Sequence, residues 1–118
     1  MSHSLSDASL QQIQLAKSRI TQISPDQAQT LVQNGAVLID VREREEFETH
    51  HLPGAINISR AVLADHIPAL IPNPSTPVVC YCAGGNRGAL ATDALQQLGY
   101  KNVVSIQGGL NACALPAS

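Results

Sequence analysis

Short apolar runs that alternate with helical patterns constrain the fold of this chain more than any other feature of its sequence. Residues 36–41, 55–58, 77–81 and 102–106 are four such runs, and residues 20–23 form a weaker fifth. A continuous apolar run of this length is typical of a strand that is buried on both faces. Strands that alternate with helices predict right-handed crossovers and therefore an α/β domain with a mainly parallel sheet.

Helical patterns lie before and between these runs. Apolar residues spaced by threes and fours predict an amphipathic helix over residues 6–19. A capping box opens a second helix over residues 24–35, and a glycine ends it. Residues 60–70 and 89–98 carry further helical patterns, each followed by a proline or a glycine that stops it.

The length of the chain bounds the number of domains. Its 118 residues are enough for one domain of ordinary size. We therefore expect an N-terminal helical extension over residues 1–19 and one folded domain over residues 20–118. Only 3% of the residues are aromatic while 44% are hydrophobic, so aliphatic side chains must build nearly all of the core.

Charge and hydropathy exclude several classes of partner. Seven Lys and Arg against nine Asp and Glu give a formal net charge of −2, with the basic residues scattered, so we expect no binding to nucleic acid. No apolar stretch approaches the roughly 20 residues that span a bilayer, and no signal peptide is visible, so we expect no membrane association. Three cysteines form no disulfide framework, which favours a cytoplasmic location.

The strand run that ends at Tyr81 leads into the most distinctive segment of the chain. In open α/β sheets, ligands bind outside the carboxyl ends of the strands. There Cys82 opens a glycine-rich turn that runs through an arginine into a helix, which is a pattern suited to holding an anion. The loop amides, the helix dipole and Arg87 favour the thiolate form of Cys82, so we predict that Cys82 is a catalytic nucleophile.

The residues after Cys82 are the predicted substrate-binding residues. Their backbone N–H groups can converge on whatever Cys82 carries, and small side chains leave room for that approach. We expect the glycines, and Asn86 among the other residues, to supply the left-handed backbone geometry of the turn. The predicted set is Ala83, Gly84, Gly85, Asn86, Arg87 and Gly88.

Three segments together resemble the single-domain rhodaneses, which are thiosulfate-type sulfurtransferases. They are residues 40–47 (DVREREEF), 51–57 (HLPGAIN) and 82–87 (CAGGNR), and the similarity covers about residues 20–116. The resemblance implies a rhodanese-like α/β domain with a five-stranded, mainly parallel sheet flanked by helices on both faces. It also implies that Cys82 accepts a sulfane sulfur as a persulfide and passes it to a nucleophile, without a metal or an organic cofactor.

The length of the cysteine loop separates this reading from its nearest alternative. Four residues stand between Cys82 and Arg87, as in the sulfur-handling rhodaneses, whereas the related dual-specificity phosphatases have a loop one residue longer. A longer ring of amides is needed to surround a tetrahedral phosphoryl group than to surround the single terminal sulfur of a persulfide. The short loop therefore favours sulfur transfer over a phosphatase or an arsenate reductase.

Other polar and sulfur-containing side chains are predicted to have supporting or structural roles. Asp40 and Arg42 resemble the family's Asp-x-Arg pair, and we expect them to support the site as an ion pair. His51 is expected to hold the turn before the strand run at 55–58. Cys80 is two residues from Cys82 on one strand, so core packing is favoured over a resolving role. Cys113 is expected to be inert, and the cysteine spacing predicts no metal site.

Two functions from different classes stay open at this point. The first is an enzyme that moves a sulfane sulfur from thiosulfate or a persulfide to cyanide or a thiol, with small-molecule donor and acceptor. The second is a sulfur carrier that hands its persulfide to a protein thiol without turnover on small molecules. The predicted helix at 6–19 is the best candidate for a docking surface in that second case.

Overall fold

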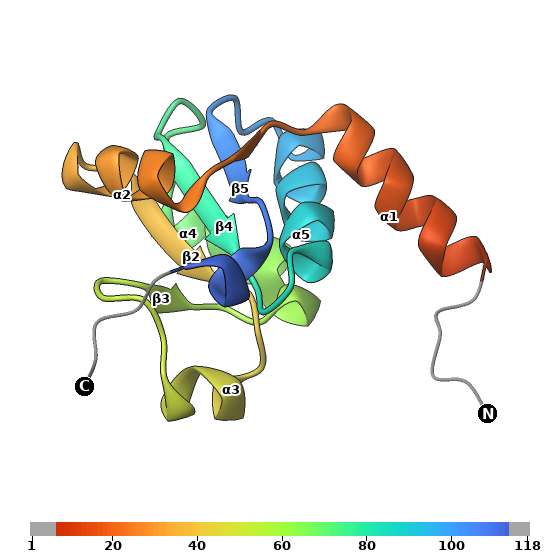
Figure 1. Ribbon diagram of the computed structural model, residues 1–118. Coiled ribbons are helices and arrows are strands. Elements are labelled where there is room, and N and C mark those ends of the chain that lie inside the picture. Colours follow the sequence, from red (N-terminus) through yellow and green to blue (C-terminus); the bar gives the residue numbers. More distant parts are fainter. Residues whose placement is uncertain (1–6, 114–118) are drawn as a thin grey trace.

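A computed structural model describes residues 7–113 as a five-stranded sheet with helices on both faces (Figure 1). The strand order is β1-β5-β4-β2-β3, and every pair of neighbouring strands is parallel. The strands are β1 (Gln22–Ile23), β2 (Val37–Asp40), β3 (Ile56–Asn57), β4 (Val78–Tyr81) and β5 (Val103–Ile106). The expected α/β fold is confirmed, with strands a residue or two shorter than the apolar runs.

The helices fall largely where the apolar patterns place them. They are α1 (Asp7–Arg19), α2 (Pro25–Gln33), α3 (Arg44–Thr49), α4 (Leu63–Leu70) and α5 (Asn86–Gln97), with 3-10 helices η1 (Arg60–Val62) and η2 (Gly109–Ala112). The expected capping box of α2 is present, since the Ser24 hydroxyl accepts from Gln27 N–H and the Gln27 side chain accepts from Ser24 N–H. The start of the first predicted helix, at residue 6, lies outside the described residues.

Three helical segments differ from the sequence expectations. The pattern at 60–70 splits into η1 and α4. α5 begins three residues earlier than the apolar pattern indicates, because its first turn is polar and glycine-rich and carries no periodic signal. α3 is not predicted at all, since a six-residue helix with no buried residue leaves no apolar stripe in the sequence.

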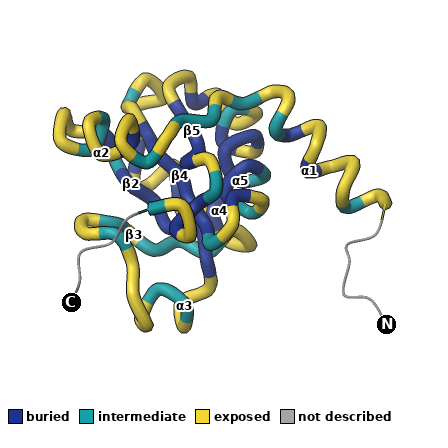
Figure 2. Tube along the Cα trace, in the orientation of Figure 1, coloured by how far each residue is buried: buried dark blue, intermediate teal, exposed yellow. Residues whose placement is uncertain are grey.

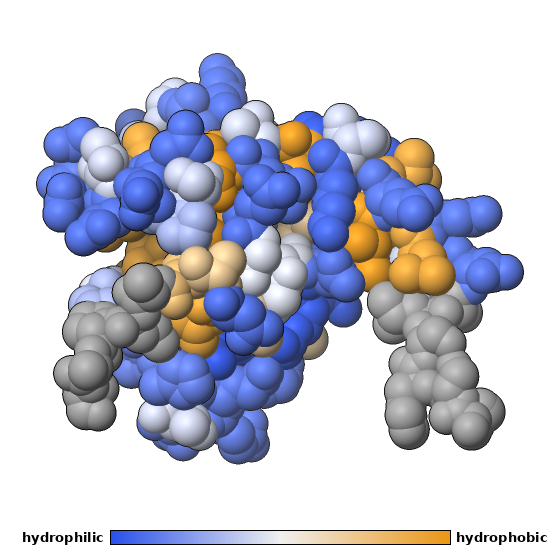
Figure 3. All heavy atoms as spheres, in the orientation of Figure 1, coloured by the Kyte–Doolittle hydropathy of each residue, from blue (hydrophilic) through white to orange (hydrophobic). Residues whose placement is uncertain are grey.

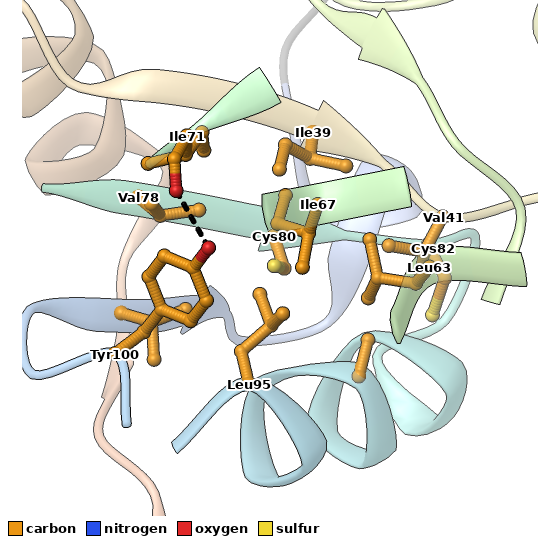
Figure 4. Packing of buried hydrophobic residues seen from close by; sticks show 12 residues of the cluster. Ile39, Val41, Leu63, Ile67, Ile71, Val78, Cys80, Cys82, Leu95 and Tyr100 are labelled. Carbon is orange, nitrogen blue, oxygen red and sulfur yellow. Dashed lines mark hydrogen bonds between the residues drawn. The ribbon is translucent and has the colours of Figure 1, made fainter. Parts of the chain in front are cut away.

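Two apolar clusters, one on each face of the sheet, form the core. The buried parts of the chain lie mainly in the central strands and in α5, whereas α1 and α3 are largely exposed (Figure 2). α4 and α5 cover one face, and α2 with η2 cover the other. β4 lies between the two clusters and is buried along its whole length. Figure 4 shows the first cluster, in which Cys80 and Cys82 point to the same side of β4, toward α5. In the same view the Tyr100 hydroxyl donates to the carbonyl of Ile71 at 2.6 Å.

α1 lies along α5 at the side of the domain (Figure 1). Ile13 and Ala16 form its buried face, and the Arg19 guanidinium donates two hydrogen bonds of 3.0 and 2.8 Å to the carboxylate of Asp93 on α5. Leu10 and Leu15 are exposed, and apolar residues appear on this part of the surface in Figure 3. α1 therefore packs on the domain through α5, with two isolated exposed leucines on an otherwise mostly polar helix.

None of the helices between residues 7 and 113 combines the length and the apolar character needed to cross a membrane.

Candidate active site

Cys82 stands directly after β4, at the carboxyl end of the central strand of the sheet. Its side chain is buried with only 1% of the residue exposed, and its sulfur lies under the loop that comes next in the chain. The backbone N–H of Gly85 donates to the Cys82 Sγ at 3.1 Å. The predicted arrangement, in which a loop amide is aimed at the sulfur, is therefore present at this position.

The N-terminus of α5 completes the loop. Gly85 is the N-cap with φ of +108°, and α5 begins at Asn86. The N–H groups of the first turn of a helix have no partner inside the helix, and the helix dipole places partial positive charge there. The N–H groups of Asn86, Arg87 and Gly88 therefore belong to this first turn, at the end of α5 nearest the sulfur.

The expected left-handed role of Asn86 is wrong. Among the described residues only glycines have positive φ, and Gly85 supplies the turn immediately before the helix. Asn86 itself is helical and exposed. Of the other predicted loop residues, Ala83 is half-buried and Gly84 is exposed, with open space around its Cα. The mouth of the loop is therefore at Gly84 and Asn86.

Gly88 lies behind the loop rather than at its mouth. A Cβ at this position would lie 3.2 Å from the Ser105 Oγ and 3.3 Å from the backbone nitrogen of Cys82. The Ser105 hydroxyl is buried and has no hydrogen-bond partner within residues 7–113. A glycine at 88 thus leaves room for Ser105, whereas any larger side chain there would crowd it. Nothing in the sequence pattern singled out Ser105.

Arg87 reaches from the first turn of α5 to Glu46 on α3. Its Nη1 and Nη2 donate to the two carboxylate oxygens of Glu46 at 2.7 and 3.0 Å, and both side chains are about one-third exposed. The hydrogen bonds from Arg87 lower the pKa of Glu46 to about 2, and those same bonds raise the pKa of Arg87. Glu46 was missed as a site residue, because its role depends on a helix that leaves no sequence signal.

Asp40 and Arg42 form a second, buried ion pair at the end of β2. The Arg42 Nη2 lies 2.8 Å from the Asp40 Oδ2, and both side chains are at most 4% exposed. Arg42 also donates to the carbonyl of His50 at 2.7 Å, and the Asn57 amide donates to the carbonyls of Asp40 and Arg42 at 3.0 Å each. Together these bonds tie the ends of β2, α3 and β3 to one another beside the cysteine loop.

The remaining predicted residues lie apart from the sulfur. His51 is exposed; its ring stacks on Phe47, and its Nδ1 lies 2.8 Å from the Phe47 carbonyl oxygen. Cys80 is wholly buried in the core, and burial raises its thiol pKa to about 12. Cys113 borders a cavity of about 440 Å³ between α2 and the 52–53 turn, on the sheet face opposite Cys82, and burial raises its pKa as well.

These features define a class of protein before any comparison is made. A parallel α/β domain carries a cysteine at the end of its central strand, a short loop with one amide aimed at the sulfur, and an arginine on the next helix. The class is that of α/β domains that hold a cysteine sulfur beside a loop suited to binding an anion.

Comparison with known proteins identifies the family. Residues 24–115 match the family described as the Rhodanese-like domain. Thiosulfate sulfurtransferase GlpE from Pseudomonas syringae pv. syringae is 38% identical over 87 residues, which cover 74% of this chain and 80% of that protein. The chain therefore belongs to the rhodanese-like family and is related to sulfurtransferases of the GlpE type.

Solved structures agree on the fold. A Rhodopseudomonas palustris protein of unknown function, described as a possible tyrosine phosphatase, superposes with a TM-score of 0.81 at 29% identity, over 95% of this chain and 92% of that chain. The human single-domain sulfurtransferase TSTD1 superposes with a TM-score of 0.67 at 30% identity, over 77% of this chain and 92% of that chain.

Proposed function

We propose that this protein is a thiosulfate sulfurtransferase that carries sulfane sulfur as a persulfide on Cys82. The observation that carries the proposal is the 3.1 Å hydrogen bond from the Gly85 N–H to the Cys82 Sγ, at the N-terminus of α5. An amide aimed at a sulfur stabilises negative charge on it, and both the thiolate and the persulfide anion carry such charge. The relationship to GlpE sulfurtransferases supports the same choice of substrate.

In the first half-reaction the Cys82 thiolate attacks the outer sulfur of thiosulfate. A new S–S bond forms to Cys82 while the bond between the two thiosulfate sulfurs breaks, and its electron pair leaves with sulfite. The charge is conserved, since a thiolate and a dianion become a persulfide anion and the sulfite dianion. The attacking species is the thiolate, so the step itself takes no proton from Cys82 and needs no general base.

In the second half-reaction a thiophilic acceptor attacks the terminal sulfur of the persulfide. With cyanide, a carbon–sulfur bond forms, the S–S bond to Cys82 breaks, and the electron pair returns to the Cys82 thiolate as thiocyanate departs. A low-molecular-weight or protein thiol can accept the sulfur in the same manner. The cycle is therefore of the ping-pong type and regenerates the starting enzyme.

Arg87 supplies the charge that an anionic donor requires. Its Nη1 and Nη2 are engaged by Glu46, yet its side chain is about one-third exposed and the guanidinium has further N–H donors. A thiosulfate sulfonate group at the mouth of the loop can be held by these donors and by the free amides of the first turn of α5. The predicted substrate-binding role of Arg87 is therefore compatible with its ion pair.

The short loop argues against hydrolysis of phosphate esters. Only Ala83, Gly84 and Gly85 separate Cys82 from the first residue of α5, and the sulfur is already in contact with the third of these. A phosphoryl group has three non-bridging oxygens, which a loop of this length would have to surround with its few amides. A single terminal sulfur atom needs fewer amides around it than a phosphoryl group does.

We assign this activity to the cytoplasm. Cys80, Cys82 and Cys113 are all free thiols, which a reducing compartment maintains. The expected partners are a small-molecule sulfur donor and acceptor.

A steady-state assay of thiocyanate formation from thiosulfate and cyanide tests the proposal. The wild type is expected to give parallel lines in double-reciprocal plots, and Cys82→Ser is expected to have no activity above background. Cys113→Ser is the matched control, because that thiol lies on the other face of the sheet, and it should keep the wild-type rate. Hydrolysis of p-nitrophenyl phosphate without thiocyanate formation would overturn the proposal in favour of a phosphatase.

A further inference from the structure

The turn after β5 contacts the back of the cysteine loop. The N–H of Leu110 donates to the carbonyl of Cys82 at 2.7 Å, and the N–H of Asn111 donates to the carbonyl of Ala83 at 2.9 Å. These two donors belong to the first turn of η2, where backbone N–H groups have no partner inside the helix. The two loop carbonyls therefore accept hydrogen bonds from N–H groups at the start of η2 that have no partner inside that helix.

These two bonds determine which way the loop amides point. In a trans peptide the C=O of one residue and the N–H of the next point in opposite directions. The structure contains no cis peptide bond among its described residues. Since the carbonyls of Cys82 and Ala83 point toward η2, the N–H groups of Ala83 and Gly84 point away from it.

Gly109 allows this close contact between the two backbones. A Cβ on Gly109 would lie 2.6 Å from the carbonyl oxygen of Ala83 and would collide with the carbonyl oxygen of Cys82. Its φ of +62° is one that asparagine also adopts, so it is the contact that requires glycine there. Gly85 is packed in the same way, since a Cβ there would lie 3.3 Å from the nitrogen of Gly108.

We propose that the η2 turn, defined as Gly108, Gly109 and the N–H groups of Leu110 and Asn111, is the positioning element for the sulfur-binding amides. It fixes the carbonyls of Cys82 and Ala83 and thereby turns the N–H groups of Ala83 and Gly84 away from η2, toward the mouth of the loop, where the terminal sulfur of a Cys82 persulfide would lie. The proposal rests on the function proposed above, and it assigns to residues outside the cysteine loop the orientation on which that function depends.

The expected effect comes from charge stabilisation. Persulfide formation leaves negative charge on the terminal sulfur, and a preoriented hydrogen-bond donor aimed at developing charge contributes about 100- to 1,000-fold to the rate of a catalysed step. The η2 turn touches no reacting atom, so its loss should act only through the amides of the loop. Both sulfur loading and the reactivity of the Cys82 thiolate toward an unrelated electrophile should change together.

Two variants test the positioning role in different ways. Gly109→Ala places a Cβ against the Cys82 and Ala83 carbonyls, whereas Asn111→Pro deletes the N–H that donates to the Ala83 carbonyl. Gly99→Ala is the matched control: Gly99 also has positive φ, +104°, but nothing lies within 4 Å of a Cβ there. Unfolding midpoints measured on all three proteins show which variants keep the fold.

The readouts are the rate of persulfide formation from thiosulfate and the pH profile of Cys82 alkylation by iodoacetamide. Both test variants are expected to load sulfur at least about 10-fold more slowly and to shift the alkylation profile to higher pH, with Gly99→Ala within about two-fold of wild type. Folded Gly109→Ala and Asn111→Pro proteins with wild-type alkylation profiles would overturn the positioning role.

The alkylation arm keeps this inference separate from the proposed function. A wild type that never loads sulfur from thiosulfate would refute the proposed donor. The comparison of alkylation profiles would still report whether the η2 turn orients the amides around Cys82.

Discussion

Two arginine–carboxylate pairs flank the cysteine loop, and they differ chiefly in burial. The Asp40–Arg42 pair joins two residues at the carboxyl end of β2, and both side chains are at most 4% exposed. The Glu46–Arg87 pair joins α3 to α5, 41 residues apart in the sequence, and each side chain is 36% exposed. Both pairs are bidentate, but Arg42 binds Asp40 side-on through Nε and Nη2, whereas Arg87 binds Glu46 end-on through Nη1 and Nη2.

The buried pair is required for the structure, whereas the partly exposed pair can exchange one partner for another. Breaking a buried pair strands an uncompensated charge, whereas an exposed partner can be replaced by water or by another anion at little cost. Arg42 is therefore committed to Asp40 and to the His50 carbonyl. Arg87 can share its guanidinium between Glu46 and an anionic donor.

The largest effect is expected from Asp40→Asn. Arg42 would keep its charge without a counter-charge in a buried site, so the free energy of unfolding should fall by about 3–5 kcal/mol. Urea unfolding of the variant and the wild type measures the change. A loss below about 1 kcal/mol would break the comparison, because the buried pair would then behave like an exposed one.

Arg87→Gln is expected to change activity more than stability. Removal of the positive charge beside Cys82 should lower kcat/KM for thiosulfate by about 100-fold, which corresponds to about 2.7 kcal/mol of transition-state stabilisation. The free energy of unfolding should fall by no more than about 1 kcal/mol, because the Glu46 pair is partly exposed. If Arg87→Gln keeps the wild-type kcat/KM, the role of Arg87 is limited to its ion pair with Glu46 on α3.

Glu46→Gln sharpens the comparison through its dependence on pH. Arg87 holds the pKa of Glu46 at about 2, below its ordinary value of 4.5, so the pair stabilises the fold fully above about pH 4.5 and loses that contribution as the pH falls toward 2. The glutamine variant lacks this titration. It should be less stable than wild type by about 1 kcal/mol or less at neutral pH, and this difference should shrink on acidification.

Chemical unfolding at a series of pH values from about 2 to neutral measures that difference. A gap between wild type and Glu46→Gln that stays constant over this range would contradict the assigned ion pair.

The smallest effect is expected at the Arg44–Glu48 pair on the outer side of α3. These side chains are 83% and 59% exposed, so Arg44→Gln should change the free energy of unfolding by about 0.5 kcal/mol or less and leave thiocyanate formation unchanged. It is the reference for an arginine near the site that contacts only solvent and its own helix. A large loss of activity would mean that binding of the sulfur donor depends on the charge of α3 as a whole and not on Arg87.

The fold was predictable because its signals are local. The strand runs around Val37 and Val78 are continuous apolar segments, and the capping box at Ser24 marks a helix start with two side-chain bonds that the structure contains. The cysteine loop was located for the same reason, since Cys82, the glycines and Arg87 are adjacent in sequence. The topology of a parallel sheet then places the loop after a central strand at the ligand-binding edge.

The parts of the site that the sequence did not predict depend on contacts between segments that are far apart in the chain. Glu46 meets Arg87 only because α3 folds under the loop, and Gly109 meets Ala83 only because β5 lies beside β4. Neither contact leaves a periodic pattern or a charge run in the sequence. The start of α5 was misplaced because the helix is capped by Gly85 in the left-handed conformation and not by a side-chain oxygen.

The most direct test of the central claim is the intact-protein mass after incubation with thiosulfate and again after addition of cyanide. The wild type should gain the mass of one sulfur atom and lose it to cyanide, while Cys82→Ser, with Cys80 and Cys113 still in place, should gain nothing. A gain that persists in Cys82→Ser would contradict the assignment of Cys82 as the sulfur carrier, and a wild type that gains no sulfur would contradict thiosulfate as its donor.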